Sequence, residues 1–192
     1  MKNLKPFLHN YIYTLKDSIL SSDLRNIDRA ANEIIRAIKR NAVIYVCGNG
    51  GSAAIANHYV CDFLKFFRER TKFKPKIISL SSNLETITAI SNDMNYEKIF
   101  SYQAESLCSK KDLIVIISSS GNSKNVKDII KFSKKNKIKT IGFSGFKGGY
   151  LKKNSDVSVH ISANNYGISE DSHHILMHVI LQYLIKFFGN KN

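Results

Sequence analysis

The stretch AVIYVCGNGGSAA, at residues 42–54, predicts a buried β-strand that runs directly into a helix through a glycine-rich turn. Its first half is rich in β-branched and apolar side chains, which is typical of a strand covered on both faces. Gly48 to Ser52 then supply flexible backbone and a hydroxyl group where the helix begins, and free N–H groups at a helix start favour an anion. Glycine-rich turns also occur simply because they are tight, so this loop alone leaves a binding role open.

Four further β-rich runs alternate with helical segments along the chain: KIISL (76–80), DLIVIIS (112–118), IKTIGFS (138–144) and DVSVHIS (156–162). Such alternation predicts a mostly parallel sheet with helices on both faces. Apolar residues at helical spacing predict two helices within residues 1–40, with Asp23 as a cap between them. The predicted fold is therefore α/β, a three-layer αβα sandwich with a five-stranded, flavodoxin-like sheet preceded by two N-terminal helices.

Composition limits the classes of protein that fit. The 192 residues are 43% hydrophobic and contain no linker or repeat, so we expect a single domain over 1–192, with N-terminal helices in 1–40 and the core in 41–192. The N-terminus does not read as a secretory signal and no apolar run is long enough to span a membrane, so we expect a cytoplasmic protein. The cysteines, Cys47, Cys61 and Cys108, suit reduced thiols.

The net charge of +14 could attract nucleic acid or phosphorylated substrates. Because the lysines are spread along the whole chain, we do not expect a nucleic-acid partner.

A second loop of the same kind follows the run at 112–118. It reads SSSGNS, residues 118–123, and offers several hydroxyl donors before the helical segment NVKDIIKFSKK. Ligands of parallel sheets bind beyond the carboxyl ends of the strands, so two such loops together favour a phosphate-bearing ligand. Neither loop matches the nucleotide-binding motifs, so ATP and NAD are not expected.

Imidazole and carboxylate groups recur at helical spacing in two places. His58 and Asp62 lie four residues apart after the glycine loop, and Glu170, His174 and His178 repeat this spacing near the C-terminus. Such groups suit zinc or a similar divalent ion. They could also act as general acid and base in moving a proton. His178 lies among apolar residues, where burial of an idle imidazole would be costly.

Together these segments resemble the sugar isomerase (SIS) domain family, and within it the phosphoheptose isomerases. The resemblance spans roughly residues 20–188 and is carried by CGNGGSAA (47–54), His58, AISND (89–93), ISSSGNSKNV (117–126), GFSGFKGG (142–149) and EDSHHILMH (170–178). It implies a ketose–aldose isomerase that converts sedoheptulose 7-phosphate to D-glycero-D-manno-heptose 7-phosphate for surface polysaccharide synthesis.

The resemblance also implies roles for individual residues. The phosphate and sugar would be bound by Ser118, Ser119, Ser120, Ser123, Asn49, Gly50, Ser52 and Asp93. A zinc ion or another divalent metal would lie between the residues that match the family's ligands, which are His58, Asp62, Glu170 and His178. Catalysis would fall to Asp62, Glu170 and His178.

Three positions depart from the family pattern. Asp62 replaces a glutamate, and Glu170 replaces a glutamine, although a one-residue gap would place Asp171 there instead. Phe66, beside Lys65, stands where the family has an arginine. These departures leave open which metal ion is bound. They also leave open a related substrate, such as another ketose phosphate of five to seven carbons.

The apolar last helix, from Ile175 to Phe188, predicts contacts with partner chains, and the resemblance implies a homotetramer whose sites lie between subunits. A second hypothesis is a non-catalytic SIS-fold adaptor that binds the replication initiator protein. A third, the sensor domain of a regulator, has less support because the sequence has no helix-turn-helix extension.

Overall fold

The computed structural model describes residues 3–189 and contains one five-stranded parallel sheet. The strands are β1 (Val43–Gly48), β2 (Lys76–Ser79), β3 (Leu113–Ser118), β4 (Lys139–Ser144) and β5 (Val157–His160), in the spatial order β2-β1-β3-β4-β5. All neighbouring pairs are parallel, which confirms the predicted sheet. The largest departure from the predicted runs is at β5, which ends at His160 rather than at residue 162.

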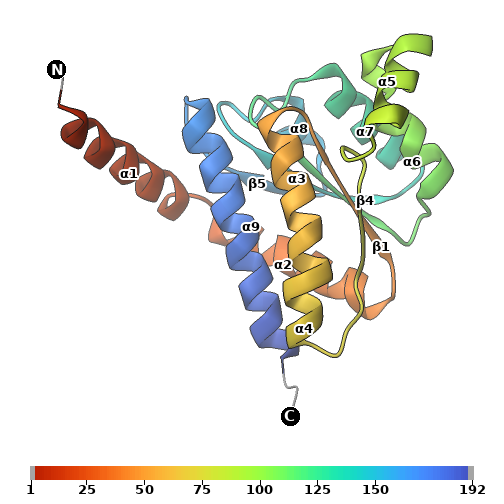
Figure 1. Ribbon diagram of the computed structural model, residues 1–192, viewed down its shortest axis with the longest axis horizontal. Coiled ribbons are helices and arrows are strands. Elements are labelled where there is room, and N and C mark those ends of the chain that lie inside the picture. The colour runs from red at the N-terminus through yellow and green to blue at the C-terminus, as the bar shows by residue number, and fades with distance from the viewer. Residues whose placement is uncertain (1–2, 190–192) are drawn as a thin grey trace.

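Helices cover both faces of the sheet and complete the predicted three layers (Figure 1). One face packs against α2 (Leu24–Lys39), α3 (Gly51–Asp62) and α9 (Tyr166–Phe188). The other packs against α5 (Leu84–Asp93), α6 (Ser101–Leu107), α7 (Lys124–Lys135) and α8 (Gly149–Asn154). Three short segments complete the helical structure, namely η1 (Phe63–Phe67) and α4 (Arg68–Arg70) after α3, and η2 (Tyr96–Lys98) before α6. None of the helices described over residues 3–189 is long and apolar enough to cross a membrane.

The central strand β3 is buried along its whole length and divides the core in two. Leu113, Val115 and Ile117 face the α3 and α9 side, whereas Ile114 and Ile116 face the α7 side. In the register of β1 with β3, Gly48 lies opposite Ile117. The glycine loop after β1 and the serine loop after β3 therefore start side by side at the carboxyl edge of the sheet.

The first helix, α1 (Leu4–Leu20), extends away from the sheet (Figure 1). The Tyr11 hydroxyl donates a hydrogen bond of 2.6 Å to the Asp171 carboxylate and so ties α1 to α9. As predicted, Asp23 caps α2, where it accepts a hydrogen bond of 3.0 Å from the backbone N–H of Arg25. Several apolar side chains of α1 remain exposed, namely Leu4, Phe7, Leu8, Ile12 and Tyr13.

Asp112 joins the starts of β1 and β3. Its carboxylate is buried and accepts hydrogen bonds from the Val43 N–H at 2.8 Å and from the Ser109 N–H and hydroxyl at 2.7 Å each. We expect Asp112→Asn to lower the free energy of unfolding by about 1–3 kcal/mol, because the amide N–H₂ would face a donor. Urea unfolding measures this change. The matched variant Asp17→Asn, on the exposed side of α1, should leave stability unchanged, and equal stability of both variants would refute this role for Asp112.

Candidate active site

A small hollow lies at the carboxyl edge of the sheet, where the glycine and serine loops meet α9. Its volume is 130 Å³, and it is lined by Asn49, Ser52, Ser118, Ser119, Ser120, Ser123, Tyr166 and Glu170. The structure thus brings together most of the predicted substrate-binding residues. We call this the serine hollow.

The hydroxyl groups of the serine loop differ in their hydrogen-bond partners. Ser118 Oγ accepts a hydrogen bond from the Gly121 N–H at 3.1 Å, and Ser120 Oγ accepts one from the Asn122 N–H at 3.3 Å. Ser119 Oγ is buried and has no hydrogen-bond partner within residues 3–189. A buried hydroxyl without a partner is costly, and Ser119 is one of the residues that line the serine hollow.

The glycine loop contributes a fixed amide and a strained backbone position. The Asn49 side chain exchanges two 2.9 Å hydrogen bonds with the buried Asn125 and accepts another, of 3.1 Å, from the Tyr96 hydroxyl. Gly50 has a φ of +53°, which favours glycine. Asp93 is exposed at the end of α5, where it accepts a hydrogen bond from the Asn92 side chain, and it lies outside the serine hollow.

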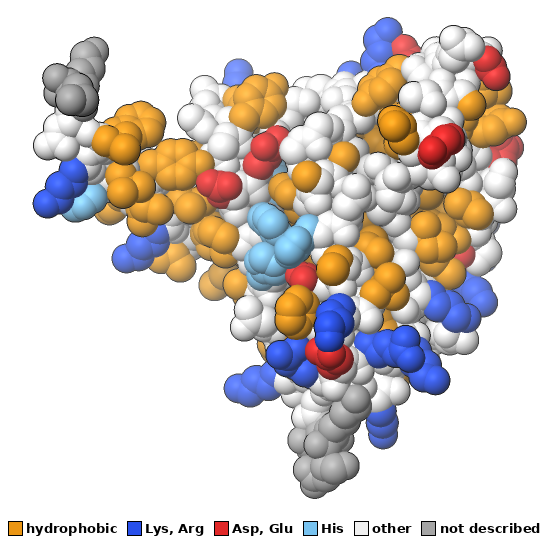
Figure 2. All heavy atoms as spheres, viewed as in Figure 1, with side chains coloured by type: hydrophobic (Ala, Val, Ile, Leu, Met, Phe, Trp, Pro, Cys, Tyr) orange, Lys and Arg blue, Asp and Glu red, His pale blue; other side chains and the backbone are white. Residues whose placement is uncertain are grey.

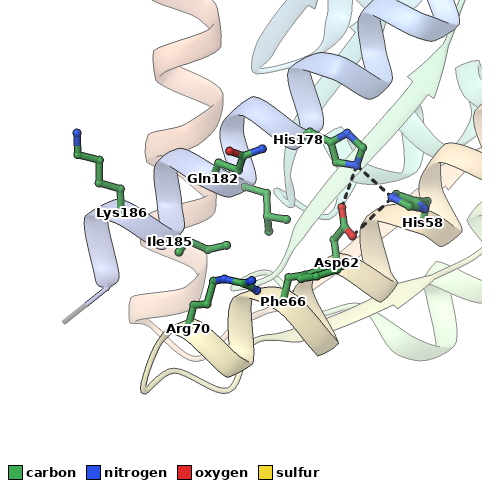
Figure 3. A pocket seen from close by; sticks show the side chains of 9 residues that line it. His58, Asp62, Phe66, Arg70, His178, Gln182, Ile185 and Lys186 are labelled. Atoms are coloured by element: carbon green, nitrogen blue, oxygen red, sulfur yellow. Dashed lines mark hydrogen bonds and ion pairs between the residues drawn. The ribbon is translucent and has the colours of Figure 1, made fainter. Parts of the chain in front are cut away.

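A larger hollow lies between α3 and α9, which run side by side in Figure 1. Its volume is 540 Å³, and it is lined by His58, Asp62, Phe66, Arg70, His178, Leu181, Gln182, Ile185 and Lys186 (Figure 3). We call this the histidine hollow. Figure 2 shows a group of histidine side chains near the centre of this face of the molecule.

Three polar groups converge in the histidine hollow. The Nε2 atoms of His58 and His178 are 3.1 Å apart. Asp62 Oδ1 lies 3.5 Å from His58 Nε2, and Asp62 Oδ2 lies 3.2 Å from His178 Nε2. Asp62 is only 3% exposed, whereas both imidazoles reach solvent. The predicted pairing of a carboxylate with imidazoles is therefore present within one chain.

A third imidazole joins this group. The His174 ring centroid is 4.7 Å from that of His58 and 4.5 Å from that of His178. Burial, and then the neighbouring His178 and His58, lower the pKa of His174 below its ordinary value. Each of the three histidines offers a ring nitrogen, and these nitrogens all lie within 4.8 Å of one another.

Glu170 is separated from the other predicted metal ligands. Its carboxylate lies against the start of α3, so close to Gly51 that any side chain at that position would collide with it. Glu170 and His178 are two helical turns apart on α9, which is about 12 Å along the axis. Asp171, the alternative candidate, is bonded to Tyr11 of α1 instead. Within one chain, the predicted set is thus divided between the two hollows.

Sequence reasoning missed three residues that line or support these hollows: Tyr166, Asn125 and Arg70. Arg70 shares the histidine hollow with Phe66, and its guanidinium carbon lies 5.3 Å from the Phe66 ring centroid. Lys65, the cation next to Phe66 in the sequence, is paired with Glu69 on the exposed surface. The four-residue spacing from Phe66 to Arg70 could have indicated this cation.

Comparison with known proteins identifies the family. The SIS domain family matches residues 8–145. A probable phosphoheptose isomerase of Thermoplasma acidophilum is 39% identical over 163 residues, which cover 84% of this chain and 88% of that protein. The chain belongs to the phosphoheptose isomerase family of SIS domain proteins.

Further relatives agree with this assignment. A phosphoheptose isomerase of Campylobacter concisus is 33% identical over 165 residues, covering 86% of this chain and 87% of that protein. The solved phosphoheptose isomerase of Neisseria gonorrhoeae has the same fold, with a TM-score of 0.86 at 24% identity over 96% of this chain and 97% of that one.

The unpartnered Ser119 hydroxyl allows a clean test of anion binding in the serine hollow. We expect Ser119→Ala to weaken the binding of inorganic phosphate about tenfold or more, because it removes a hydrogen bond to a charged group. Isothermal titration measures this affinity. Ser158→Ala is the matched control, since Ser158 Oγ in β5 is also buried and without a partner among the described residues. Equal phosphate affinity in both variants would contradict an anion site at Ser119.

Proposed function

We propose that this chain is an aldose–ketose isomerase that converts sedoheptulose 7-phosphate to D-glycero-D-manno-heptose 7-phosphate, for the heptose of surface polysaccharide. Family membership supports this reaction class. The observation that carries the proposal is the convergence of buried Asp62 with His58 and His178, on the two helices that also border the serine hollow.

In this proposal the serine hollow binds the phosphate group. The hydroxyls of the serine loop and the N–H groups at the starts of α3 and α7 donate to phosphate oxygens. Asn49 and Ser52 face the sugar hydroxyls, and the tight network around Asn49 keeps its amide in place. Binding the distant phosphate orients the carbonyl end of the sugar for reaction.

Asp62 is the proposed base. It removes a proton from C1 of the ketose, exchanges it with solvent while an enediol intermediate is bound, and then protonates C2. The proton of the C1 hydroxyl moves to the oxygen at C2 with the help of His178. Glu170 is the other candidate carboxylate. Asp62 suits the role better because it lies within 3.5 Å of two imidazoles, whereas Glu170 lines the serine hollow.

The imidazole and carboxylate groups of the histidine hollow also suit a divalent metal ion, and zinc in particular. The Nε2 atoms of His58 and His178 are 3.1 Å apart, and two ligands of a tetrahedral zinc ion with bonds of about 2.0–2.1 Å are separated by about 3.3 Å. His58 and His178 would hold the ion with the Asp62 carboxylate beside them, and Glu170, the fourth predicted ligand, lies further along α9. When bound, the ion would polarise the substrate carbonyl as a Lewis acid.

We also propose that the protein works as a homotetramer in the cytoplasm. The exposed apolar side chains of α1 favour burial against partner chains, and they line part of the face in Figure 2. The three cysteines are free thiols, which fits a reducing compartment.

Replacement of the proposed base tests the mechanism. We expect Asp62→Asn to lower turnover of sedoheptulose 7-phosphate about 10²–10⁴-fold, because the amide cannot accept the proton, and Asp62→Glu to retain activity. The assay follows formation of the aldose phosphate with zinc supplied. Glu105→Gln, which neutralises an exposed acid on α6, serves as the control. Full activity of Asp62→Asn would refute the assignment of Asp62 as the base. The same assay with ketose phosphates of five to seven carbons decides which of them is the substrate.

Sedimentation tests the assembly. At micromolar concentration we expect a tetramer, and we expect Phe7→Glu, which places a charge on the exposed apolar side of α1, to shift the protein towards smaller species. Lys16→Glu, an exposed change on the same helix, should leave the tetramer intact. A wild-type monomer under these conditions would contradict the proposal.

A further inference from the structure

His174 occupies a position that the predicted metal site does not use. It lies one helical turn before His178 on α9, so the two side chains leave the helix on the same side. The rings of His174 and His178 are inclined by only 33°, and both meet the His58 ring edge-on, at 77° and 76°. Each of the three imidazoles thus brings a ring nitrogen to the space between α3 and α9, where these nitrogens lie within 4.8 Å of one another.

The nitrogen that His174 directs inside the protein has no partner. His174 Nε2 is buried and makes no hydrogen bond within residues 3–189. His58 and His178, in contrast, already direct Nε2 atoms towards each other and towards Asp62. A buried imidazole nitrogen without a hydrogen-bond partner is costly, and one ring nitrogen of each of the three histidines lies within 4.8 Å of the others.

Glu170 is poorly placed to act as a metal ligand together with His58 and His178 of the same chain. Its carboxylate lies against Gly51 at the start of α3 and lines the serine hollow. His174 is one turn closer to His178 than Glu170 is, so it brings a donor to the histidine hollow that Glu170 cannot bring from the same helix.

We infer that His174 is a metal ligand, and that His58, His174 and His178 form a three-histidine site for zinc or a similar divalent ion within one chain. Three histidines with a fourth position left for water or substrate are typical of catalytic zinc sites. Asp62 flanks this group and Glu170 remains free to line the serine hollow. Only the use of the ion in catalysis rests on the proposed function; the binding itself does not.

Metal binding without turnover tests this inference. Zinc affinity of the metal-free, full-length protein is measured by competition with a chromogenic chelator, and cobalt substitution reports the coordination by its visible absorption. We expect His174→Ala to lower zinc affinity at least about tenfold and to change the cobalt spectrum. His174→Asn, which is closer in size and polarity, should show the same loss, and circular dichroism confirms that each variant is folded.

Two control variants separate this site from its alternatives. His9→Ala removes an exposed histidine of α1 and should leave zinc affinity unchanged. Glu170→Gln should also leave it unchanged. Wild-type affinity in both His174 variants, a loss of affinity in Glu170→Gln, or the absence of zinc binding by the wild type would overturn the inference.

The outcomes also distinguish this inference from the proposed function. A protein that binds zinc through His174 but does not convert sedoheptulose 7-phosphate would support the metal site and refute the proposed reaction. An active protein whose zinc affinity is unaffected in the His174 variants would support the proposed reaction and refute the metal site.

Discussion

The packing of α3 against α9 is the constraint on which the candidate site depends. Each helix alone presents its polar side chains at four-residue intervals, and only their close contact places the Nε2 atoms of His58 and His178 3.1 Å apart. The same contact buries Asp62, so that its carboxylate lies in a medium of low dielectric beside two imidazoles. The apolar residues Ile55, Leu181 and Leu184 hold the two helices in the same hydrophobic core.

The sheet supplies the other half of the site. Because β1 and β3 are adjacent and parallel, the loops that follow them meet at one edge, and the helices α3 and α7 start there. Glu170 at the beginning of α9 borders this serine hollow, while His174 and His178 follow on later turns towards the histidine hollow. One helix therefore connects the proposed phosphate site with the proposed site of proton transfer.

Much of this arrangement could be predicted from the sequence because local chemistry determines it. The β-branched runs predicted the strands, and the position of the glycine and serine loops after two strands of a parallel sheet predicted that these loops would meet. The four-residue spacing predicted which residues of α3 share a side, but it could not predict which turn of α9 would lie opposite. The separation of Glu170 from His178 and the approach of His174 to His58 depend on how the two helices pack.

The turn after Asp62 was also beyond sequence reasoning. Residues Phe63–Phe67 form a π-helical turn, which widens the helix immediately after the proposed base. Phe66 and Arg70 then both line the histidine hollow. Arg70 supplies a cation there, although Phe66 stands at the position where the family has an arginine. No local pattern in FLKFF distinguishes this turn from an ordinary α-helix.

The central claim is that the protein moves a proton between C1 and C2 of a ketose phosphate through a protein-bound carboxylate. Incubation of sedoheptulose 7-phosphate with the zinc-supplied protein in D₂O, followed by NMR of the product, tests this most directly. The account predicts an aldose phosphate that carries solvent deuterium at C2. Failure to form the aldose, or an aldose with no deuterium at that carbon, would contradict it.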